Sequence, residues 1–181
     1  MTTYRRVLVL GGARSGKSGL ALQLAESTSA ERTYIATAQA FDDEMRERIS
    51  LHRRERDASW QTFDAPLELS AAIRDLTVPG KAVLVDCLTL WLSNIVLAKR
   101  DPEQEGDRLV RSIREARGPL ILVSNEVGQG IVPPTPLGRS FRDAQGRLNQ
   151  RVAEACEAVV FVAAGCPILL KPAPALHLRL E

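Results

Sequence analysis

Short runs of apolar, often β-branched residues recur along the chain, and longer stretches with helical spacing separate them. A continuous apolar run is typical of a strand buried on both faces, and its alternation with helices is typical of a parallel sheet with helices on both faces. The predicted strands are residues 7–10, 33–36, 82–86, 120–124 and 158–163. The predicted helices are residues 17–27, 42–57, 66–76, 88–98, 106–116 and 140–156. The expected fold class is therefore α/β, with a mostly parallel sheet.

Two irregular segments interrupt this alternation. Residues 99–106 (KRDPEQEG) are polar and contain both proline and glycine, which predicts a surface connection between two helices. Residues 125–138 (NEVGQGIVPPTPLG) are rich in the same two residue types and begin where a predicted strand ends. Ligands of doubly wound sheets bind at the carboxyl ends of the strands, so this second segment is a candidate part of a binding site. A rigid structural loop is the alternative.

Length and composition restrict the class of protein further. A chain of 181 residues with 45% hydrophobic and 25% charged residues has the composition of a globular protein, and we expect one domain over residues 1–181. The formal net charge of +2 is too small for a nucleic-acid footprint. No nucleic-acid partner is therefore expected.

The cysteines and the first residues bear on the compartment. Cys87, Cys156 and Cys166 show no metal-ligand spacing, and an odd number of cysteines argues against a disulfide framework. The first apolar run is only four residues long and stops at glycines, which fits neither a signal sequence nor a membrane span. We therefore expect a cytoplasmic protein with no membrane span.

The strongest local motif is GGARSGKS at residues 11–18, which matches G-x-x-x-x-G-K-[ST] and lies between a predicted strand and a predicted helix. Glycines let successive backbone N–H groups turn toward phosphate oxygens, and the following helix directs its positive end there. Lys17 is expected to reach the β- and γ-phosphates of a nucleoside triphosphate, and the Ser18 hydroxyl to bind Mg²⁺. The alternative, a glycine-rich turn that binds nothing, does not explain this strand and helix context.

Asp86, at the end of the predicted strand 82–86, is the candidate acidic partner of the metal. Its alternative role is to cap the helix that is predicted to begin near Leu88. The sequence contains no N-K-x-D motif, so the guanine-reading signature of a switch GTPase is absent.

His52 stands in the arginine-rich stretch RISLHRRER and is one of only two histidines in the chain. It continues the helical stripe of Met45 and Ile49, so it need not face bulk water. One interpretation is a histidine that finishes an apolar stripe beside solvated arginines. The other is a nucleophile, since a neutral imidazole can attack phosphorus while Arg53 and Arg56 stabilise the charge on its oxygens. The spacing leaves both interpretations open.

Several blocks of the sequence together resemble one known family. They are GGARSGKS (11–18), YIATAQ (34–39), DDEMRERISLHRRER (42–56), WQTFDAP (60–66), VLVDCLTLW (83–91) and SNEVGQGIVPPTPLGRSFRDAQGRLNQRVA (124–153). The chain is similar, over essentially its whole length, to the bifunctional adenosylcobinamide kinase / adenosylcobinamide-phosphate guanylyltransferases of cobalamin biosynthesis.

This resemblance implies two reactions. The enzyme would phosphorylate adenosylcobinamide with ATP or GTP, and then transfer GMP from GTP to that phosphate through a guanylyl-histidine intermediate. The family's histidine falls on His52, which with Lys17 is then catalytic. The nucleotide-contacting positions that the resemblance implies are Gly11, Gly12, Ala13, Arg14, Ser15, Gly16, Lys17, Ser18, Ala36, Thr37, Ala38, Arg53, Arg54, Glu55, Arg56, Asp64 and Asp86. Ser18 and Asp86 are the implied Mg²⁺ ligands.

The resemblance also implies a RecA-like P-loop core and a homotrimer whose active sites lie near the subunit interfaces. Two other functions fit the residues as well. A monofunctional small-molecule kinase would use the same P-loop but carry no covalent GMP. A non-catalytic nucleotide-binding module would bind nucleotide without turning over an acceptor.

Overall fold

The computed structural model describes residues 3–40, 43, 46–47, 56–174 and 179. Its centre is one seven-stranded sheet with the order β3-β2-β4-β5-β1-β6-β7. The strands are β1 (Arg6–Gly11), β2 (Glu31–Ala36), β3 (Trp60–Asp64), β4 (Lys81–Asp86), β5 (Leu120–Asn125), β6 (Ala158–Ala163) and β7 (Cys166–Lys171). The helices are α1 (Lys17–Thr28), α3 (Leu69–Leu76), α4 (Leu88–Leu97), α5 (Pro102–Arg114) and α6 (Pro136–Ala155). Neighbouring strands are parallel except β6 and β7, which pair antiparallel.

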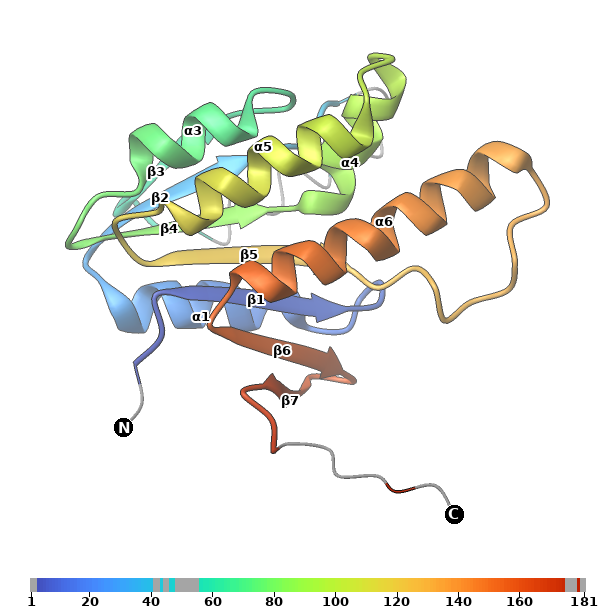
Figure 1. The fold of residues 1–181 in the computed structure, drawn as a ribbon. Coiled ribbons are helices and arrows are strands. Elements are labelled where there is room, and N and C mark those ends of the chain that lie inside the picture. Colours follow the sequence, from blue (N-terminus) through green and yellow to red (C-terminus); the bar gives the residue numbers. More distant parts are fainter. Residues whose placement is uncertain (1–2, 41–42, 44–45, 48–55, 175–178, 180–181) are drawn as a thin grey trace.

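Helices α3, α4, α5 and α6 cover one face of the sheet, and α1 covers the other (Figure 1). Strand β1 shows why the sequence of a central strand is continuously apolar. Leu8 and Leu10 pack with the four helices, whereas Val9 packs with α1. Because successive side chains of a strand point to opposite faces, a strand covered on both sides needs an apolar residue at every position. The predicted α/β class, with a mostly parallel sheet and helices on both faces, is confirmed.

Helix α5 begins earlier than the sequence pattern predicted. It starts at Pro102 rather than at residue 106, because the Asp101 carboxylate accepts a hydrogen bond from the Glu103 backbone N–H at 2.9 Å and caps the helix. Proline is tolerated at the first helical position, where its missing N–H would have no partner within the helix. The predicted surface connection over residues 99–106 is therefore wrong in its second half.

Helix α6 also begins earlier, at Pro136 instead of residue 140, with Thr135 accepting a hydrogen bond from the Gly138 backbone N–H at 3.1 Å. Its first turns extend beyond the edge of the helical layer (Figure 1). None of the helices in the described part of the chain has the length and apolar character needed to cross a membrane.

The sequence pattern missed the two edge strands. In β3 only Trp60 is buried, and the first five residues of β7 are exposed. An edge strand that lacks cover has no continuous buried run, and the apolar runs used for prediction detect only covered strands. Helix α3 was predicted from residue 66 and begins at Leu69.

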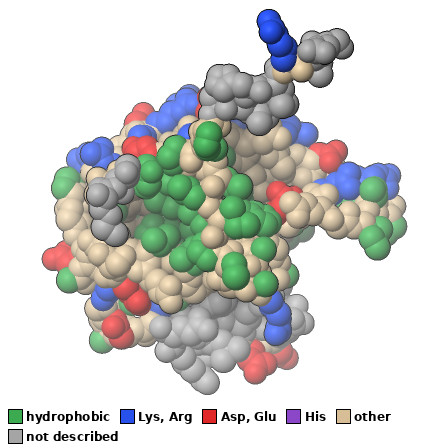
Figure 2. All heavy atoms as spheres, turned by 90° about the horizontal axis from the view of Figure 1, so that it is seen from below, with side chains coloured by type: hydrophobic (Ala, Val, Ile, Leu, Met, Phe, Trp, Pro, Cys, Tyr) green, Lys and Arg blue, Asp and Glu red, His purple; other side chains and the backbone are tan. Residues whose placement is uncertain are grey.

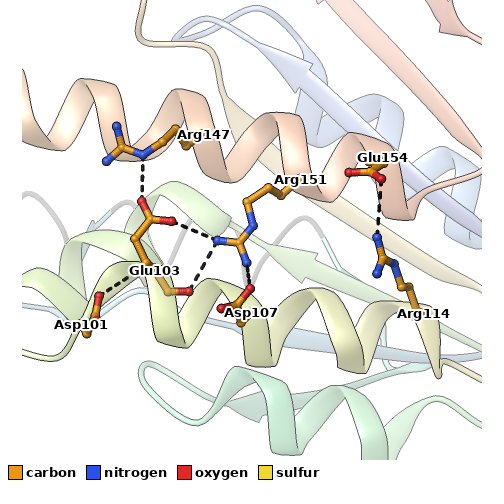
Figure 3. A network of polar contacts seen from close by, with 7 residues as sticks. All are labelled: Asp101, Glu103, Asp107, Arg114, Arg147, Arg151 and Glu154. Atoms are coloured by element: carbon orange, nitrogen blue, oxygen red, sulfur yellow. Dashed lines mark hydrogen bonds and ion pairs between the residues drawn. The ribbon is translucent and has the colours of Figure 1, made fainter.

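Charged side chains join α5 to α6 in one network (Figure 3). Glu103 accepts hydrogen bonds from Arg147 Nε at 2.8 Å and from Arg151 Nη1 at 3.2 Å. Arg151 also pairs with Asp107. Gly106 makes room for this arginine, since a Cβ at that position would lie 3.0 Å from Arg151 Nη1. The network joins the two helices, which lie on the same face of the sheet.

We expect Arg151→Met to lower the free energy of unfolding by about 1 kcal/mol, because a partly exposed arginine with several acidic partners contributes only modestly. Urea unfolding at low and high salt measures this, and the loss should shrink at high salt, which screens such pairs. Arg111→Met, at an exposed arginine of α5, is the control and should change the free energy of unfolding by less than about 0.5 kcal/mol. Equal losses in both variants would contradict the role of the network.

The three cysteines differ in reactivity. Cys87 and Cys156 are buried and Cys166 is exposed. Burial raises the pKa of the Cys87 thiol to about 11 and that of Cys156 to about 12. Since the thiolate is the reactive form, we expect a thiol-specific reagent at pH 8 to label Cys166 alone in the native protein. Native Cys166→Ser should then show no fast labelling, and all three thiols of the wild type should react after unfolding.

Candidate functional site

The glycine-rich loop lies between β1 and α1, as its motif predicted. Gly16 precedes the helix with a φ of 95°, a conformation that favours glycine. A Cβ on Gly11 would lie 2.4 Å from Ser15 Oγ and 2.6 Å from the Val162 carbonyl oxygen, so this position has no room for a side chain. The loop therefore depends on glycine at its first and sixth positions for two different reasons.

The start of α1 is open to an anion. Gly16 at the cap position has no side chain that could cap the helix, and the first turn contains no acidic residue. The first N–H groups of a helix lack partners within it, and they carry the positive end of the helix dipole. Lys17 is 9% exposed, and its Nζ donates a hydrogen bond to the Gly12 carbonyl oxygen at 3.0 Å. Backbone donors and a lysine are thus gathered around one short loop, an arrangement that suits phosphate groups.

Asp86 faces this loop across one strand, because β5 lies between β4 and β1. Asp86 lines a pocket together with Ser18, Tyr34 and Arg56 and with the apolar residues Leu22, Leu84 and Val123. The structure places Cys87, and not Asp86, at the cap position of α4. Asp86 Oδ2 instead accepts a hydrogen bond from the Tyr34 hydroxyl at 2.6 Å.

The pocket brings together two hard oxygen groups, the Ser18 hydroxyl and the Asp86 carboxylate. Among the residues that the structure describes, no group of three or more His, Cys, Asp or Glu side chains could hold a metal by itself. Mg²⁺ bound to nucleotides is typically held by one or two protein oxygen ligands together with phosphates and water. The residues present therefore fit a nucleotide-bound Mg²⁺.

Tyr34 is a member of this site that the sequence interpretation missed. Burial raises the pKa of its hydroxyl, and the charge of Asp86 raises it further, so the group stays protonated and donates to the carboxylate. The Arg56 guanidinium lies 3.6 Å from the centre of the Tyr34 ring. A polar aromatic residue within a buried strand is the one signal in the sequence that marks it, since a buried tyrosine hydroxyl needs a partner.

Thr37, from the segment Ala36, Thr37 and Ala38, is fully buried and has a structural role. Its hydroxyl accepts a hydrogen bond from the Cys87 backbone N–H at 2.9 Å and donates one to the Cys87 carbonyl oxygen at 2.8 Å. Its own carbonyl oxygen accepts a hydrogen bond from Asn94 Nδ2 at 2.8 Å. These bonds connect the end of β2 to the residue that follows Asp86. Ala36 and Ala38 are partly accessible on either side.

The remaining predicted residues are not all brought together. Asp64 is exposed at the end of the edge strand β3, opposite Ala36. Four inter-strand spacings separate β3 from β1, which is about 19 Å at ~4.8 Å per spacing. Asp64 therefore does not reach the phosphate loop within this chain.

His52 and the neighbouring residues Arg53, Arg54 and Glu55 lie outside the described residues. Of the helix predicted over residues 42–57, residues 43 and 46–47 are helical, and Arg56 lies beyond any helix. The segment 125–138 begins at the end of β5, next to the phosphate loop: the Glu126 backbone N–H donates to the Gly11 carbonyl oxygen at 3.1 Å.

Fold and site together define a P-loop nucleotide-binding protein. Solved structures agree on the fold. The type III secretion ATPase EscN of enteropathogenic E. coli aligns with a TM-score of 0.55 and 12% identity, over 89% of this chain and 43% of that one. Another type III secretion ATPase aligns with a TM-score of 0.50 and 14% identity, over 87% of this chain and 50% of that one. At such identities the likeness concerns the fold alone, and the predicted RecA-like P-loop core is confirmed.

Sequence comparison gives the family. Residues 7–170 match the family described as cobinamide kinase / cobinamide phosphate guanyltransferase, and the chain belongs to this family. It is 48% identical over 171 residues to the bifunctional adenosylcobalamin biosynthesis protein CobP of Pseudomonas aeruginosa, an alignment that covers 93% of this chain and 99% of that protein. It is 38% identical over 180 residues to the protein CobU of Salmonella typhimurium, covering 91% and 99%. The predicted family, and with it an enzyme of the kinase and guanylyltransferase class acting on nucleotide substrates, is confirmed.

Proposed function

We propose that this chain phosphorylates adenosylcobinamide with ATP or GTP, and then transfers GMP from GTP to that phosphate through a guanylyl group carried by His52. The observation that carries the proposal is the position of Arg56. This residue, the last of the arginine-rich stretch, lines one pocket with Ser18 and Asp86, the two residues proposed to hold Mg²⁺. His52 precedes Arg56 by four residues, a stretch that spans at most about 14 Å when fully extended.

The kinase step needs positioning and no covalent residue. The hydroxyl of adenosylcobinamide attacks the γ-phosphorus, its proton is released, and the bond from the γ-phosphorus to the bridging oxygen breaks. Lys17 and the N–H groups at the start of α1 hold the triphosphate and receive the charge of the leaving nucleoside diphosphate. Mg²⁺, when bound, neutralises further phosphate charge, and Ser18 and Asp86 are the residues proposed to hold it.

The guanylyl step needs a nucleophile. A neutral His52 nitrogen attacks the α-phosphorus of GTP, a P–N bond forms, and the bond to the bridging oxygen breaks with release of pyrophosphate. In the second half, a phosphate oxygen of adenosylcobinamide phosphate attacks the same phosphorus, the P–N bond breaks, and adenosylcobinamide-GDP leaves. We propose that Arg56 and Arg53 stabilise the negative charge on the equatorial oxygens of the α-phosphorus.

The proposed nucleotide contacts come from several separate segments of the chain. They are the loop residues 11–18, residues 36–38, residues 53–56, Asp64 and Asp86. The distance of about 19 Å between β3 and β1 requires Asp64 to contact the nucleoside end, or a nucleotide held by another subunit.

We further propose a cytoplasmic homotrimer, in which residues 1–181 of each copy form one catalytic unit. Its support is the amount of apolar surface left uncovered. Ile131, in the loop before α6, is 97% exposed, and Leu137, in the first turn of α6, is 66% exposed. Hydrophobic side chains also gather on the face seen from below, on the side of α1, β6 and β7 (Figure 2). Patches of this kind mark association surfaces, and light scattering coupled to size exclusion tests for three copies.

Intact-mass analysis of the wild type after incubation with GTP and Mg²⁺, without acceptor, tests the central claim. We expect a GMP adduct that acid removes and that adenosylcobinamide phosphate discharges, and peptide mapping should place it on His52. A wild type that phosphorylates adenosylcobinamide but takes up no GMP would instead identify a monofunctional kinase. Nucleotide binding without any acceptor turnover would identify a non-catalytic module.

A further inference from the structure

Tyr34 touches both halves of the pocket with one side chain. Its hydroxyl donates a hydrogen bond to Asp86 Oδ2 at 2.6 Å, and the Arg56 guanidinium lies over its ring, 3.6 Å from the ring centre. We propose that Tyr34 is a positioning residue that couples Asp86, on the proposed metal side of the pocket, to Arg56. This inference rests on the proposed function, because it assigns different tasks to the two sides.

The tyrosine is itself held firmly. It is 6% exposed, in strand β2, which pairs with β3 on one side and β4 on the other. Trp60 packs edge-on against its ring, with the centroids 6.3 Å apart and the planes at 80°. The Arg32 guanidinium lies 5.5 Å from the centre of the Trp60 ring. A side chain fixed in this way offers a rigid support for whatever rests on it.

The hydroxyl contact acts on Asp86. A carboxylate at the end of a strand can rotate about its side-chain bonds, and a short hydrogen bond to one oxygen fixes that rotation. Hydrogen bonds to a charged acceptor are stronger than neutral ones. Tyr34 thereby orients the carboxylate within the pocket that it shares with Ser18. Both reactions use a metal-bound triphosphate, so this contact should serve both.

The ring contact acts on Arg56. A guanidinium over an aromatic face is attracted by the negative charge of that face, most strongly where water is excluded. The stack places a fixed positive charge in the pocket and holds the chain four residues after His52. Only guanylyl transfer uses that segment as a nucleophile carrier, so loss of the stack should impair this reaction further.

Two substitutions separate the contacts. Tyr34→Phe keeps the ring and its stack but removes the hydrogen bond to Asp86, whereas Tyr34→Leu removes both. Tyr4→Phe is the matched control, because it deletes a tyrosine hydroxyl from the segment before β1. The first assay uses electron paramagnetic resonance to measure Mn²⁺ binding to the complex of the enzyme with a non-hydrolysable GTP analogue. The other two assays measure the rate of GMP adduct formation and the rate of adenosylcobinamide phosphorylation.

For Tyr34→Phe we expect Mn²⁺ affinity to fall about 10-fold, and both rates at limiting metal to fall by a similar factor, as for one lost charge-assisted hydrogen bond. High metal should rescue both rates. For Tyr34→Leu we expect the same loss of Mn²⁺ affinity and a further loss of about 10-fold in adduct formation alone. Tyr4→Phe should match the wild type throughout.

Unchanged Mn²⁺ affinity in Tyr34→Phe would overturn the Asp86 half of the proposal, and equal adduct rates in the two variants would overturn the Arg56 half. If Tyr34→Leu proves poorly folded by its thermal midpoint, Arg56→Leu tests the same contact from the surface. Because this variant also removes the charge proposed to stabilise the equatorial oxygens, its loss of adduct formation should be at least as large as the extra loss in Tyr34→Leu, at unchanged Mn²⁺ affinity, and wild-type adduct formation would contradict the stack. If the wild type forms no adduct, the proposed guanylyl-histidine is refuted. The Mn²⁺ affinity and the phosphorylation rate would still test the contact between Tyr34 and Asp86.

Discussion

His52→Ala should phosphorylate adenosylcobinamide within about threefold of the wild-type rate and lose guanylyl transfer by about 10⁴-fold or more. The kinase step transfers a γ-phosphoryl group directly to the substrate hydroxyl, so no protein nucleophile takes part. Guanylyl transfer as proposed passes through a P–N bond, which alanine cannot form. The variant should therefore accumulate adenosylcobinamide phosphate when supplied with GTP.

The measurement is a product analysis by chromatography and mass, with both nucleotides present and at matched enzyme concentration. His177→Ala is the matched control, since it removes the only other histidine of the chain, and both of its activities should equal those of the wild type. If His52→Ala still produces adenosylcobinamide-GDP at more than about one hundredth of the wild-type rate, the covalent route is wrong and direct transfer replaces it.

Lys17→Ala should abolish both activities, with each kcat/KM falling by about 10³-fold or more. The lysine is buried beside the start of α1, and its Nζ bonds to the Gly12 carbonyl oxygen within the same loop. Both reactions develop negative charge on a leaving phosphate group that this loop is proposed to hold. An ammonium group placed in advance stabilises that charge more in the transition state than in the ground state.

Steady-state kinetics of both reactions, together with calorimetric titration of GTP, measures the effect. Lys81→Ala is the control, because Lys81 lies at the opposite end of the sheet, at the start of β4, where its Nζ bonds to Gln61 Oε1 at 2.8 Å. That variant should retain both activities. A Lys17→Ala enzyme that lost only one reaction would show that the two reactions use different phosphate sites.

The fold could be predicted where burial is symmetric. The central strands are covered on both faces, so their sequences read as apolar runs, and the motif at residues 11–18 fixed the order strand, loop and helix around the site. Prediction failed for strands with little buried surface, and for helices that begin at a proline. Strands β3 and β7 lie at the edges with most of their side chains exposed. Pro102 and Pro136 lie in segments predicted to be irregular, because proline disrupts the interior of a helix, yet each stands at the start of a helix, where proline is favoured.

The local parts of the candidate site can be recognised in the sequence, whereas its long-range contacts cannot. Lys17 and Ser18 are recognisable because the loop motif is contiguous. The bond from Tyr34 to Asp86 joins residues 52 positions apart, and only the pairing of β2 with β4 makes them neighbours. Thr37, proposed as a nucleotide contact on resemblance, also has a contact that the sequence did not reveal, because its hydroxyl bonds to the backbone N–H and to the carbonyl oxygen of Cys87. A single sequence contains no record of such pairings.

The position of β1 in the sheet affects when the protein can fold during its synthesis. The P-loop motif follows β1 directly in the sequence, yet both neighbours of β1 come much later, since β5 begins at Leu120 and β6 at Ala158. The loop itself is completed by the Gly165 backbone N–H, which donates to the Ser15 carbonyl oxygen at 2.8 Å. At about 5–20 residues per second, roughly 7–30 s pass on the ribosome between synthesis of the loop and of this last support. The loop is therefore synthesised well before the strands that hold β1 in the sheet, and GTP is expected to stabilise only a chain that already contains β5 and β6.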